Sequence, residues 1–499
     1  MSVKLNSIAN FTGVGISSVT ALVTVPFLIQ YFDAESFGLI GFFFLAQAWF
    51  ALFDLGFSQV VLRAAALSRE QSANDFRRLF GSVEVLFIAI ALALLAGCWS
   101  GASWISGNWL KITELDAGVA QRSVLLIGCV LAVRFVAGVY RSCLLGLELQ
   151  VRVNVVTATS AILRYPIVYV LISSFQLDLT AYFISQVAVS LGELGFFAVF
   201  TYRSLPGGNP GVPRLRLEEL RKSLPFALSV AYSALLSAVL VQVDRFALSG
   251  SLSIEAVGFL ATVFLVTAGL GQLGGPITQA ILPRLTALST DPDRRQFFSL
   301  YLNGAEILGL VLGPLTIVIA VFPFEVLYVW TASIEAANWG ATPLRWYALG
   351  NLALAFATGP YMLLYARGNL LPHVRYISFV ALFQTPLLVV LAIYFDVAWV
   401  ARVWCALRFV DLFLWGWFVH NKLVAADFYS WLRRSFAAFL VSSPITLPVS
   451  AVLAGLELDG RAMIGVVLVC GLALCLLVAV SLSQLGRQQV REVFRQVRH

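Results

Sequence analysis

The sequence predicts an all-α integral membrane protein with about fourteen transmembrane helices. Of its 499 residues, 60% are hydrophobic and only 12% are charged, against roughly 25% charged in soluble domains. A soluble chain of this length cannot bury so much apolar surface, because long chains split into domains whose cores stop growing. Hydrophobic runs of about 20 residues, the length of helix that crosses a bilayer, recur along the chain. These observations exclude a soluble enzyme, a disordered or fibrous chain and a secreted disulfide scaffold.

The hydrophobic runs place the expected spans in order. The first run follows a single lysine and lacks a small-residue cleavage site, so we expect a span there and not a signal peptide. The expected spans are residues 9–32, 38–61, 79–100, 122–145, 153–174, 180–202, 224–247, 256–282, 298–322, 343–366, 374–395, 398–420, 435–456 and 462–484. Fourteen spans use about 280 residues and leave about 15 per connection, too few for a separate folded domain.

An internal repeat divides the chain into two halves. The segment Ala34–Leu39 recurs as Ile254–Phe259 at an offset of 220 residues. Six spans per repeat give both copies the same orientation, so we expect a pseudo-twofold axis along the membrane normal. The expected parts are an N-terminal six-helix bundle (1–202), a basic cytoplasmic linker (203–223), a C-terminal six-helix bundle (224–420), helices 13 and 14 (421–484) and a cytoplasmic tail (485–499).

Basic residues set the expected orientation. With a cytoplasmic N-terminus, 23 of the 33 basic residues lie in cytoplasmic segments and five lie on the outer side. Cytoplasmic loops of membrane proteins carry this excess of Lys and Arg. We therefore expect both termini in the cytoplasm.

No motif for cofactor or metal chemistry is present in the sequence. The six cysteines lie in apolar segments without C-x-x-C or metal-ligand spacing, and the three histidines are scattered. The segment Gly269–Gly274 fits a dinucleotide pattern, but it lies in mid-span with no preceding strand. The spacings Gly271-x-x-x-Gly275 and Gly309-x-x-x-Gly313 predict close helix contacts instead.

Charged residues inside the spans are the candidate functional groups. Arg134 and Arg141 are two turns apart on one face of span 4, and Arg164 lies near the middle of span 5. Arg408 lies near the middle of span 12, with Asp411 one turn later. An arginine at mid-bilayer costs at least about 2.5–3.5 kcal/mol, so these side chains must face a bundle interior or water.

Two explanations of these charges are open. One is internal pairing, for example of Arg408 with Asp411. The other is a cationic cavity, in which guanidinium groups bind diphosphate oxygens bidentately. The clustering of Arg134, Arg141 and Arg164 on adjacent spans favours the cavity. Further charges inside spans are Glu193 in span 6, Asp54, Glu84 and Glu306 in the inner parts of spans 2, 3 and 9, and Asp244 and Arg245 at the outer end of span 7.

Short motifs in both halves resemble a known family. The first half carries Asn10, Gly13, Pro26, Glu35-x-x-Gly38 and Asp54-Leu55-Gly56. The second half begins with Val243-Asp244-Arg245-Phe246, Glu255-x-x-Gly258-Phe259 and Pro276 through Pro283-Arg284-Leu285. These motifs resemble the Wzx-type polysaccharide and O-antigen flippases of the multidrug/oligosaccharidyl-lipid/polysaccharide (MOP) exporter superfamily.

The resemblance implies two six-helix bundles around a central cavity that opens to either side in turn. The implied cargo is a glycan on undecaprenyl diphosphate, moved from the cytoplasmic to the periplasmic leaflet of the bacterial inner membrane. Membrane lipids are expected partners, as are a glycan polymerase and a chain-length regulator. No enzymatic activity, cofactor, metal or nucleic acid is expected.

The resemblance also suggests roles for the charges inside the spans. Cationic lumen residues of the family correspond to Arg134, Arg141, Arg164 and Arg408. Asp244 and Arg245 match a recurrent family position and are expected to form a gate or hinge pair. Relatives can use ion gradients, for which Asp54, Glu193 and Asp411 are the candidate proton or cation sites.

Three other functions are compatible with a polytopic membrane protein. An ion-coupled multidrug exporter of the same superfamily is disfavoured, because cationic drugs prefer carboxylates and aromatic rings to an arginine-rich lumen. A polyprenyl-dependent glycosyltransferase or polymerase usually carries a large external loop, whereas the outer loops here reach only about 20 residues, near 102–121 and 323–342. The third is a non-transporting scaffold of a glycan assembly complex, in which neutralised internal arginines would leave surface glycan intact.

Overall fold

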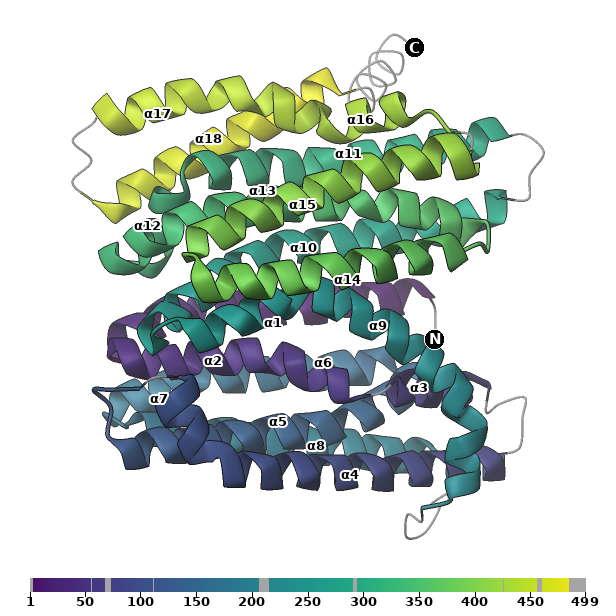
Figure 1. The fold of residues 1–499 in the computed structure, drawn as a ribbon, viewed down its shortest axis with the longest axis vertical. Coiled ribbons are helices and arrows are strands. Elements are labelled where there is room, and N and C mark those ends of the chain that lie inside the picture. The colour runs from purple at the N-terminus through teal and green to yellow at the C-terminus, as the bar shows by residue number, and fades with distance from the viewer. Residues whose placement is uncertain are drawn as a thin grey trace. The chain divides into compact units, whose positions relative to one another are not determined.

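The computed structural model describes residues 3–54, 56–67, 73–110, 112–205, 215–289, 294–424, 426–455 and 460–483, and within these ranges it contains helices and no strand. The helices are α1 (Val3–Tyr31), α2 (Ala34–Phe50), η1 (Ala51–Asp54), α3 (Phe57–Leu67), α4 (Ala73–Trp104), η2 (Ile105–Trp109), α5 (Ala117–Gly146), α6 (Gln150–Ile162), η3 (Leu163–Ile167), α7 (Val168–Ser174), α8 (Leu179–Ser204), α9 (Leu217–Ser251), α10 (Ile254–Leu288), α11 (Arg294–Val321), α12 (Pro323–Thr331), α13 (Ile334–Ala366), α14 (Leu371–Tyr394), α15 (Val397–Phe418), η4 (Val419–Val424), α16 (Phe428–Ser442), η5 (Ser443–Ile445), α17 (Thr446–Gly455) and α18 (Arg461–Leu482) (Figure 1). This confirms the all-α prediction.

Ten helical segments in the described ranges are long and apolar enough to cross a membrane. The protein is therefore a multi-pass membrane protein, and each of the expected spans overlaps a helix. The number fourteen stays a prediction, because α1, α2, α9 and α15 are not among those ten segments.

The chain forms two compact units, residues 1–261 and 262–499. The first unit therefore includes α9 and the first two turns of α10. The bundle boundaries expected from the sequence stay a prediction. Residues 206–214 of the expected linker and the whole expected tail, 485–499, lie outside the described residues.

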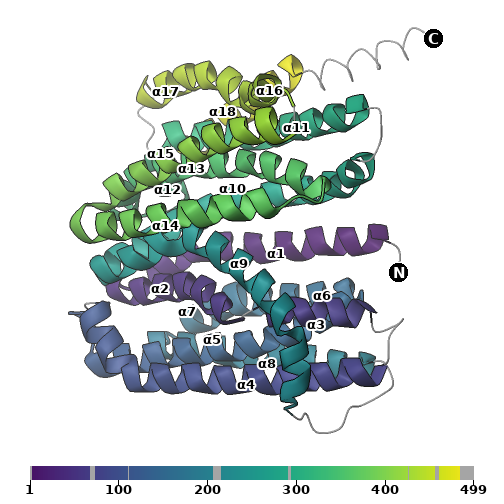
Figure 2. The ribbon, with the colours of Figure 1, turned by 45° about the vertical axis from the view of Figure 1, so that its right-hand side comes forward.

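Three long helices, α4, α5 and α8, run side by side in the first unit (Figures 1 and 2). Phe87 of α4 stacks on Phe135 of α5 with ring centroids 4.6 Å apart, and both rings are buried. Gly146 at the end of α5 lets α3 approach, since a Cβ there would lie 2.3 Å from the carbonyl oxygen of Leu62. This packing fixes the faces of α5 and α8 that carry the internal charges.

Two of the expected spans are not single continuous α-helices. Residues 38–61 break between α2 and α3, where Gly56 adopts a left-handed φ of 77° that favours glycine. Asp54, the last residue of η1, caps the start of α3, because its Oδ1 accepts a hydrogen bond of 2.9 Å from the Ser58 amide. Residues 153–174 are distorted into the π-helical turn η3 around Pro166, which lacks an amide donor.

The two copies of the repeated motif both begin helices, α2 and α10, and these helices touch within the first unit. A Cβ on Gly38 would lie 2.1 Å from the carbonyl oxygen of Ile254, and a Cβ on Gly41 would lie 2.8 Å from the Cα of Gly258. Glycine is therefore required at this crossing, because any side chain would separate the two backbones.

In the second unit α11 packs on α16 and α13 on α15. A Cβ on Gly309 would lie 2.3 Å from the Ser435 carbonyl oxygen, and one on Gly313 would lie 2.7 Å from the Phe439 nitrogen. The predicted close contact at these two glycines is confirmed. The same prediction is wrong for Gly271 and Gly275, which have no atom of another described element within 4 Å of an added Cβ.

Candidate functional site

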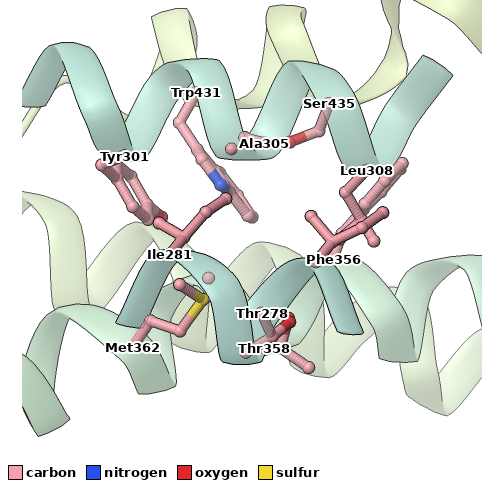
Figure 3. A pocket seen from close by; sticks show the side chains of 13 residues that line it. Thr278, Ile281, Tyr301, Ala305, Leu308, Phe356, Thr358, Met362, Trp431 and Ser435 are labelled. Atoms are coloured by element: carbon pink, nitrogen blue, oxygen red, sulfur yellow. The ribbon is translucent and has the colours of Figure 1, made fainter. Parts of the chain in front are cut away.

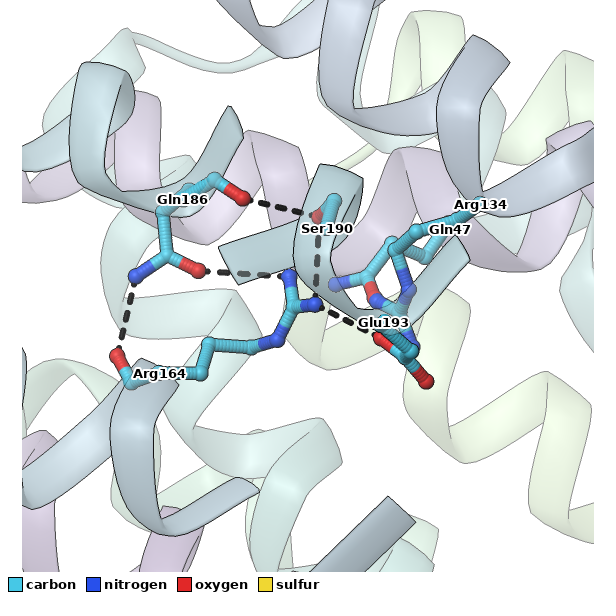
Figure 4. Close-up of polar contacts among 6 residues, drawn as sticks. All are labelled: Gln47, Arg134, Arg164, Gln186, Ser190 and Glu193. Atoms are coloured by element: carbon cyan, nitrogen blue, oxygen red, sulfur yellow. Dashed lines mark hydrogen bonds and ion pairs between the residues drawn. The ribbon is translucent and has the colours of Figure 1, made fainter. Parts of the chain in front are cut away.

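Arg164 is buried at the centre of a polar network between η3 and α8 (Figure 4). Its guanidinium group donates hydrogen bonds to Gln186 Oε1 at 3.3 Å and to Ser190 Oγ at 3.1 Å, and pairs with Glu193 Oε2 at 3.0 Å. Gln186 in turn donates to the Arg164 carbonyl oxygen at 2.9 Å, in the turn distorted by Pro166. Every acceptor is therefore spaced along one face of α8.

Arg134 and Arg141 lie on α5 beside this network and differ from Arg164 in their contacts. Arg134 is half-buried and donates a hydrogen bond to Gln47 Oε1 of α2. Arg141 is exposed and makes no hydrogen bond or ion pair with any described residue. Arg134 and Arg141 are close enough to this network to interact with it electrostatically. Arg134 repels Arg141 and Arg164, and Glu193 attracts Arg141 and Arg164.

The charges of this cluster do not balance. Three guanidinium groups, those of Arg134, Arg141 and Arg164, surround one carboxylate, that of Glu193. Because Glu193 is within bonding distance of Arg164 alone, the charges of Arg134 and Arg141 are left without a carboxylate partner among the described residues. The structure therefore brings three of the four predicted lumen arginines together and leaves Arg141 without a bond to any described residue.

Arg408 forms a separate network in the second unit. It is buried on α15, pairs with Asp411 Oδ2 at 3.2 Å and donates to Gln384 Oε1 of α14. Asp411 also accepts from Gln384 Nε2 at 3.0 Å and from the Tyr376 hydroxyl at 2.8 Å. The internal pairing considered from the sequence is thus present, and the substrate-binding role of Arg408 stays a prediction.

The two networks share three kinds of side chain. Each consists of a buried arginine, a carboxylate and a glutamine from two neighbouring helical segments, η3 and α8 in the first unit and α14 and α15 in the second. In both networks the paired charges are largely removed from solvent. Such pairs are satisfied internally, so they are better suited to fixing helix positions than to binding a ligand.

The remaining predicted site residues lie apart from the cluster. Asp54 caps α3 through its hydrogen bond with the Ser58 amide. Asp244 is completely buried and Arg245 half-buried near the end of α9, where Phe246 packs on Trp109 with ring centroids 5.0 Å apart. The predicted roles in ion coupling and as a gate or hinge stay predictions.

Glu84 is a buried carboxylate that the sequence did not single out as a site. It lies on α4 with 3% exposure, and its Oε1 accepts hydrogen bonds from the hydroxyls of Tyr140 and, at 2.6 Å, Tyr202. In the sequence, Glu84 is a lone glutamate within an apolar run. Residue spacing alone cannot show that Tyr140 and Tyr202, which lie on other helices, contact it.

The second unit contains a small cavity lined by Tyr301, Phe356, Trp431 and Ser435 among others (Figure 3). About 20 Å³ of it is open to the centre of a water molecule, which is room for about one water. The Ser435 hydroxyl is buried there without a hydrogen-bond partner in the described part of the chain. The cavity is too small for an oligosaccharide.

A family model described as polysaccharide biosynthesis protein matches residues 3–289, which is more than half of the chain. The chain belongs to this family. A Shigella flexneri protein named as an O-antigen transporter is 22% identical to this chain over 334 residues. The matched residues cover 66% of this chain and 77% of the Shigella protein.

Two solved structures are similar to this chain in fold. The lipid II flippase MurJ, in an inward closed conformation, is similar with a TM-score of 0.71 and 13% identity, covering 97% of this chain and 99% of its own. A multidrug resistance MATE family transporter of the MOP superfamily, in an inward-facing conformation, has a TM-score of 0.68 and 12% identity, covering 82% and 95%. The chain therefore shares the fold of these two transporters.

Proposed function

We propose that this protein is a flippase that moves undecaprenyl-diphosphate-linked oligosaccharide, such as an O-antigen, capsule or exopolysaccharide repeat unit, between membrane leaflets. Membership of the polysaccharide biosynthesis family supports it, as does likeness to an O-antigen transporter and to a lipid II flippase. These relatives are transporters and not catalytic enzymes. Transport needs no bond to be made or broken, only replacement partners for sugar groups that cannot cross hydrocarbon unaided.

The uncompensated arginines carry this proposal. A diphosphate diester has one negative charge on each phosphate, and guanidinium groups bind such oxygens bidentately. Among the described residues Arg141 has no bonding partner and Arg134 has only the Gln47 amide, so both can bind an anion without first breaking an ion pair. The same charges would repel the cationic drugs that multidrug exporters carry, which disfavours that alternative despite the MATE-like fold.

The distribution of basic residues supports a direction of transport. We place both termini in the cytoplasm of a bacterium, with the protein in the inner membrane, because 23 of the 33 basic residues then lie on the cytoplasmic side. The cargo is then taken up from the cytoplasmic leaflet and released to the periplasmic leaflet by alternating access. A glycan polymerase and a chain-length regulator would act on the released cargo.

The direct test combines deletion of the gene with arginine variants. We expect the deletion strain to accumulate a lipid-linked glycan on the cytoplasmic leaflet and to lose the corresponding surface glycan. Arg141→Ala should reproduce most of this defect, because loss of one charge-assisted contact of about 1.5–3 kcal/mol weakens binding roughly tenfold to a hundredfold. Arg141→Lys should keep part of the activity, since the charge remains but the bidentate geometry is lost.

Arg122→Ala is the matched control, because Arg122 is an exposed arginine of the same helix that only bonds the Gly118 carbonyl oxygen. It should export normally. Normal export by both Arg134→Ala and Arg141→Ala would remove the cluster from the mechanism. Drug sensitivity without any glycan defect on deletion would favour the exporter, and glycan lengthening by the purified protein would favour an enzyme.

A further inference from the structure

The second unit has an open cleft between the last turns of α10 and the first turns of α11. About 430 Å³ of the cleft is open to the centre of a water molecule, against about 20 Å³ for the cavity at Ser435. The cleft can therefore admit a group much larger than a water molecule. Its polar lining residues are Arg284 of α10 and Arg295, Gln296, Ser299 and Asn303 of α11.

Helical spacing brings the polar residues of α11 onto one side of this cleft. Arg295, Ser299 and Asn303 follow one another at intervals of four residues, so they share one face of the helix. Directly after Asn303 the two helices touch, since a Cβ on Gly304 would lie 2.6 Å from Ile281 Cδ1 of α10. The cleft therefore lies on the Arg295 side of this contact.

The polar side chains of the cleft offer hydrogen-bond donors to a ligand. Arg284 and Arg295 are exposed, and a guanidinium group can only donate. Asn303 Oδ1 already accepts a hydrogen bond of 2.9 Å from Arg434 of α16, which leaves the amide nitrogen of Asn303, a donor. The Ser299 hydroxyl can donate as well. None of the described lining residues is acidic, so the cleft is suited to an anion.

Other cations lie at the same end of the second unit. Arg367, which follows α13, lies over the ring of Phe297 with its guanidinium carbon 5.9 Å from the centroid. Partial burial lowers the pKa of Arg367, and the positive charge of Arg294 lowers it further. The buried carboxylate of Glu306 is paired with Arg434 at 3.5 Å. These charges favour an anion in the cleft at long range as well as by contact.

The position of the cleft along α11 indicates where such an anion comes from. The apolar segment of α11 that is long enough to cross the membrane begins at Arg294. Residues at the end of a spanning helix lie at the level of the lipid head groups, whose phosphates are the most abundant anions there. The apolar lining residues Leu288 and Leu300 add a surface that an acyl chain can contact.

We propose that this cleft binds the phosphate group of an anionic membrane lipid. Arg284 and Arg295 contact the phosphate oxygens, which a planar guanidinium group matches in geometry, and Ser299 and Asn303 donate further hydrogen bonds. The site lies in the second unit, whereas the arginine cluster proposed to bind the cargo lies in the first. It therefore goes beyond the proposed flippase function and does not depend on it.

The first experiment titrates the full-length protein in detergent with phosphatidylglycerol and measures the Kd by native mass spectrometry. Arg295→Gln should raise the Kd roughly tenfold to hundredfold, because it removes a charge-assisted contact. Ser299→Ala keeps every charge and should raise the Kd roughly twofold to tenfold, because it removes a neutral hydrogen bond. Arg375→Gln is the matched control, since Arg375 is an exposed arginine in the first turns of α14 and does not line the cleft.

Three outcomes of this titration would overturn the proposal. Equal weakening by Arg295→Gln and Arg375→Gln, with no effect of Ser299→Ala, would indicate general attraction to basic helix ends and not a defined site. Binding of zwitterionic phosphatidylcholine as tight as that of phosphatidylglycerol would contradict selection of an anion. Displacement of the lipid by an equal concentration of inorganic diphosphate would identify a soluble phosphate compound as the ligand.

The second experiment locates the bound lipid without any substitution. A phosphatidylglycerol analogue with a photoreactive diazirine on its head group is cross-linked to the wild-type protein, and the labelled peptides are identified. Labelling should concentrate at Arg284 and residues 295–303 and should disappear with excess unlabelled phosphatidylglycerol. Labelling that is equally strong at Arg152 and Arg203 of the first unit would overturn the proposal. Neither experiment measures transport, so a failed flipping assay would contradict the flippase function and leave these results standing.

Discussion

A buried arginine of this protein is available to a ligand only if no carboxylate is already paired with it. Arg164 and Arg408 are each paired at hydrogen-bonding distance, at 3.0 and 3.2 Å. Arg141, one residue beyond Tyr140 on α5, has no such partner and is exposed. The two kinds of arginine should therefore respond differently to substitution, the paired ones through stability and the unpaired ones through binding.

The pair of Arg164 and Glu193 gives the stability prediction. Glu193→Ala should lower stability by roughly 3–5 kcal/mol, because it leaves the buried Arg164 guanidinium without its carboxylate. The double variant Arg164→Met/Glu193→Leu should recover most of the loss, because apolar side chains of similar volume need no counter-charge. Thermal unfolding in nanodiscs, followed by tryptophan fluorescence, measures both changes.

Glu218→Ala serves as the control for this pair. Glu218 forms an exposed ion pair with Lys222 at 2.8 Å, and such pairs contribute little to stability because water and salt screen them. If Glu193→Ala melts at the same temperature as the wild type, then Arg164 is solvated in the folded protein and the network does not stabilise the bundle.

Residue spacing predicted only the charge pair whose two members lie on one helix. The pairing of Arg408 with Asp411 follows from a separation of three residues on α15. The pairing of Arg164 with Glu193 could not be predicted, because 29 residues and a turn separate them and the π-helical turn at Pro166 changes which face Arg164 presents. Glu84 was missed for the same reason, since its partners come from two other helices.

The start of α2 is tied to the segment that precedes α5 by a single carboxylate. Glu35 Oε1 accepts from the amide and hydroxyl of Thr113 at 2.9 and 3.0 Å, and Oε2 accepts from the amides of Glu114 and Leu115 at 2.9 and 2.7 Å. Glu35 is buried at this point. The two named residues of the motif Glu35-x-x-Gly38 thus have different roles. Glu35 holds the loop at residues 113–115, and Gly38 allows α2 to pass close to α10.

We expect Glu35→Gln to loosen this loop without unfolding the helices. The amide nitrogen of Gln cannot accept hydrogen bonds, so the amides of Glu114 and Leu115 lose their acceptor at a cost of about 1–3 kcal/mol. Hydrogen exchange at residues 113–115 should become faster, while exchange within α5 stays unchanged. Glu335→Gln is the control, because Glu335 occupies the first turn of α13 but is exposed. Unchanged protection of residues 113–115 would contradict this role of Glu35.

Helix order was predictable from hydrophobic runs, but interruptions within helices were not. The break between α2 and α3 needs the left-handed backbone of Gly56, and a Cβ there would lie 2.3 Å from the carbonyl oxygen of Ala227. Hydrophobicity averaged over a span does not detect a single residue of this kind. The compact first unit, which extends through α9, could not be predicted either, because it depends on contacts between residues more than 100 positions apart.

Helix α9 decides how many times the whole chain crosses the membrane. It is 35 residues long, about 50 Å, and is not among the ten segments that qualify by length and composition. Arg216, which directly precedes its first turn, donates its amide hydrogen to Ser82 Oγ, in the N-terminal third of α4, at 3.1 Å. At its far end, Gly250 packs against Trp109, which ends the span formed by α4 and η2. The helix from Ser82 to Trp109 is about 40 Å long, more than the hydrocarbon core of about 30 Å, so we expect α9 to span as well.

This argument predicts the sides of four exposed positions. In a variant without the six native cysteines, single cysteines at Phe175 and Phe395 should react from outside the cell with a membrane-impermeant maleimide, whereas cysteines at Arg203 and Asn369 should not. Residues 175 and 395 are separated by the short helix α12, which has nine residues and is too short to span, and by α8, α9, α10, α11, α13 and α14. They therefore lie on the same side only if α9 crosses. Labelling of Phe175→Cys without Phe395→Cys would contradict the crossing of α9, and with it the fourteen spans. Labelling of Arg203→Cys and Asn369→Cys alone would keep the span count but reverse the orientation, and with it the direction of transport.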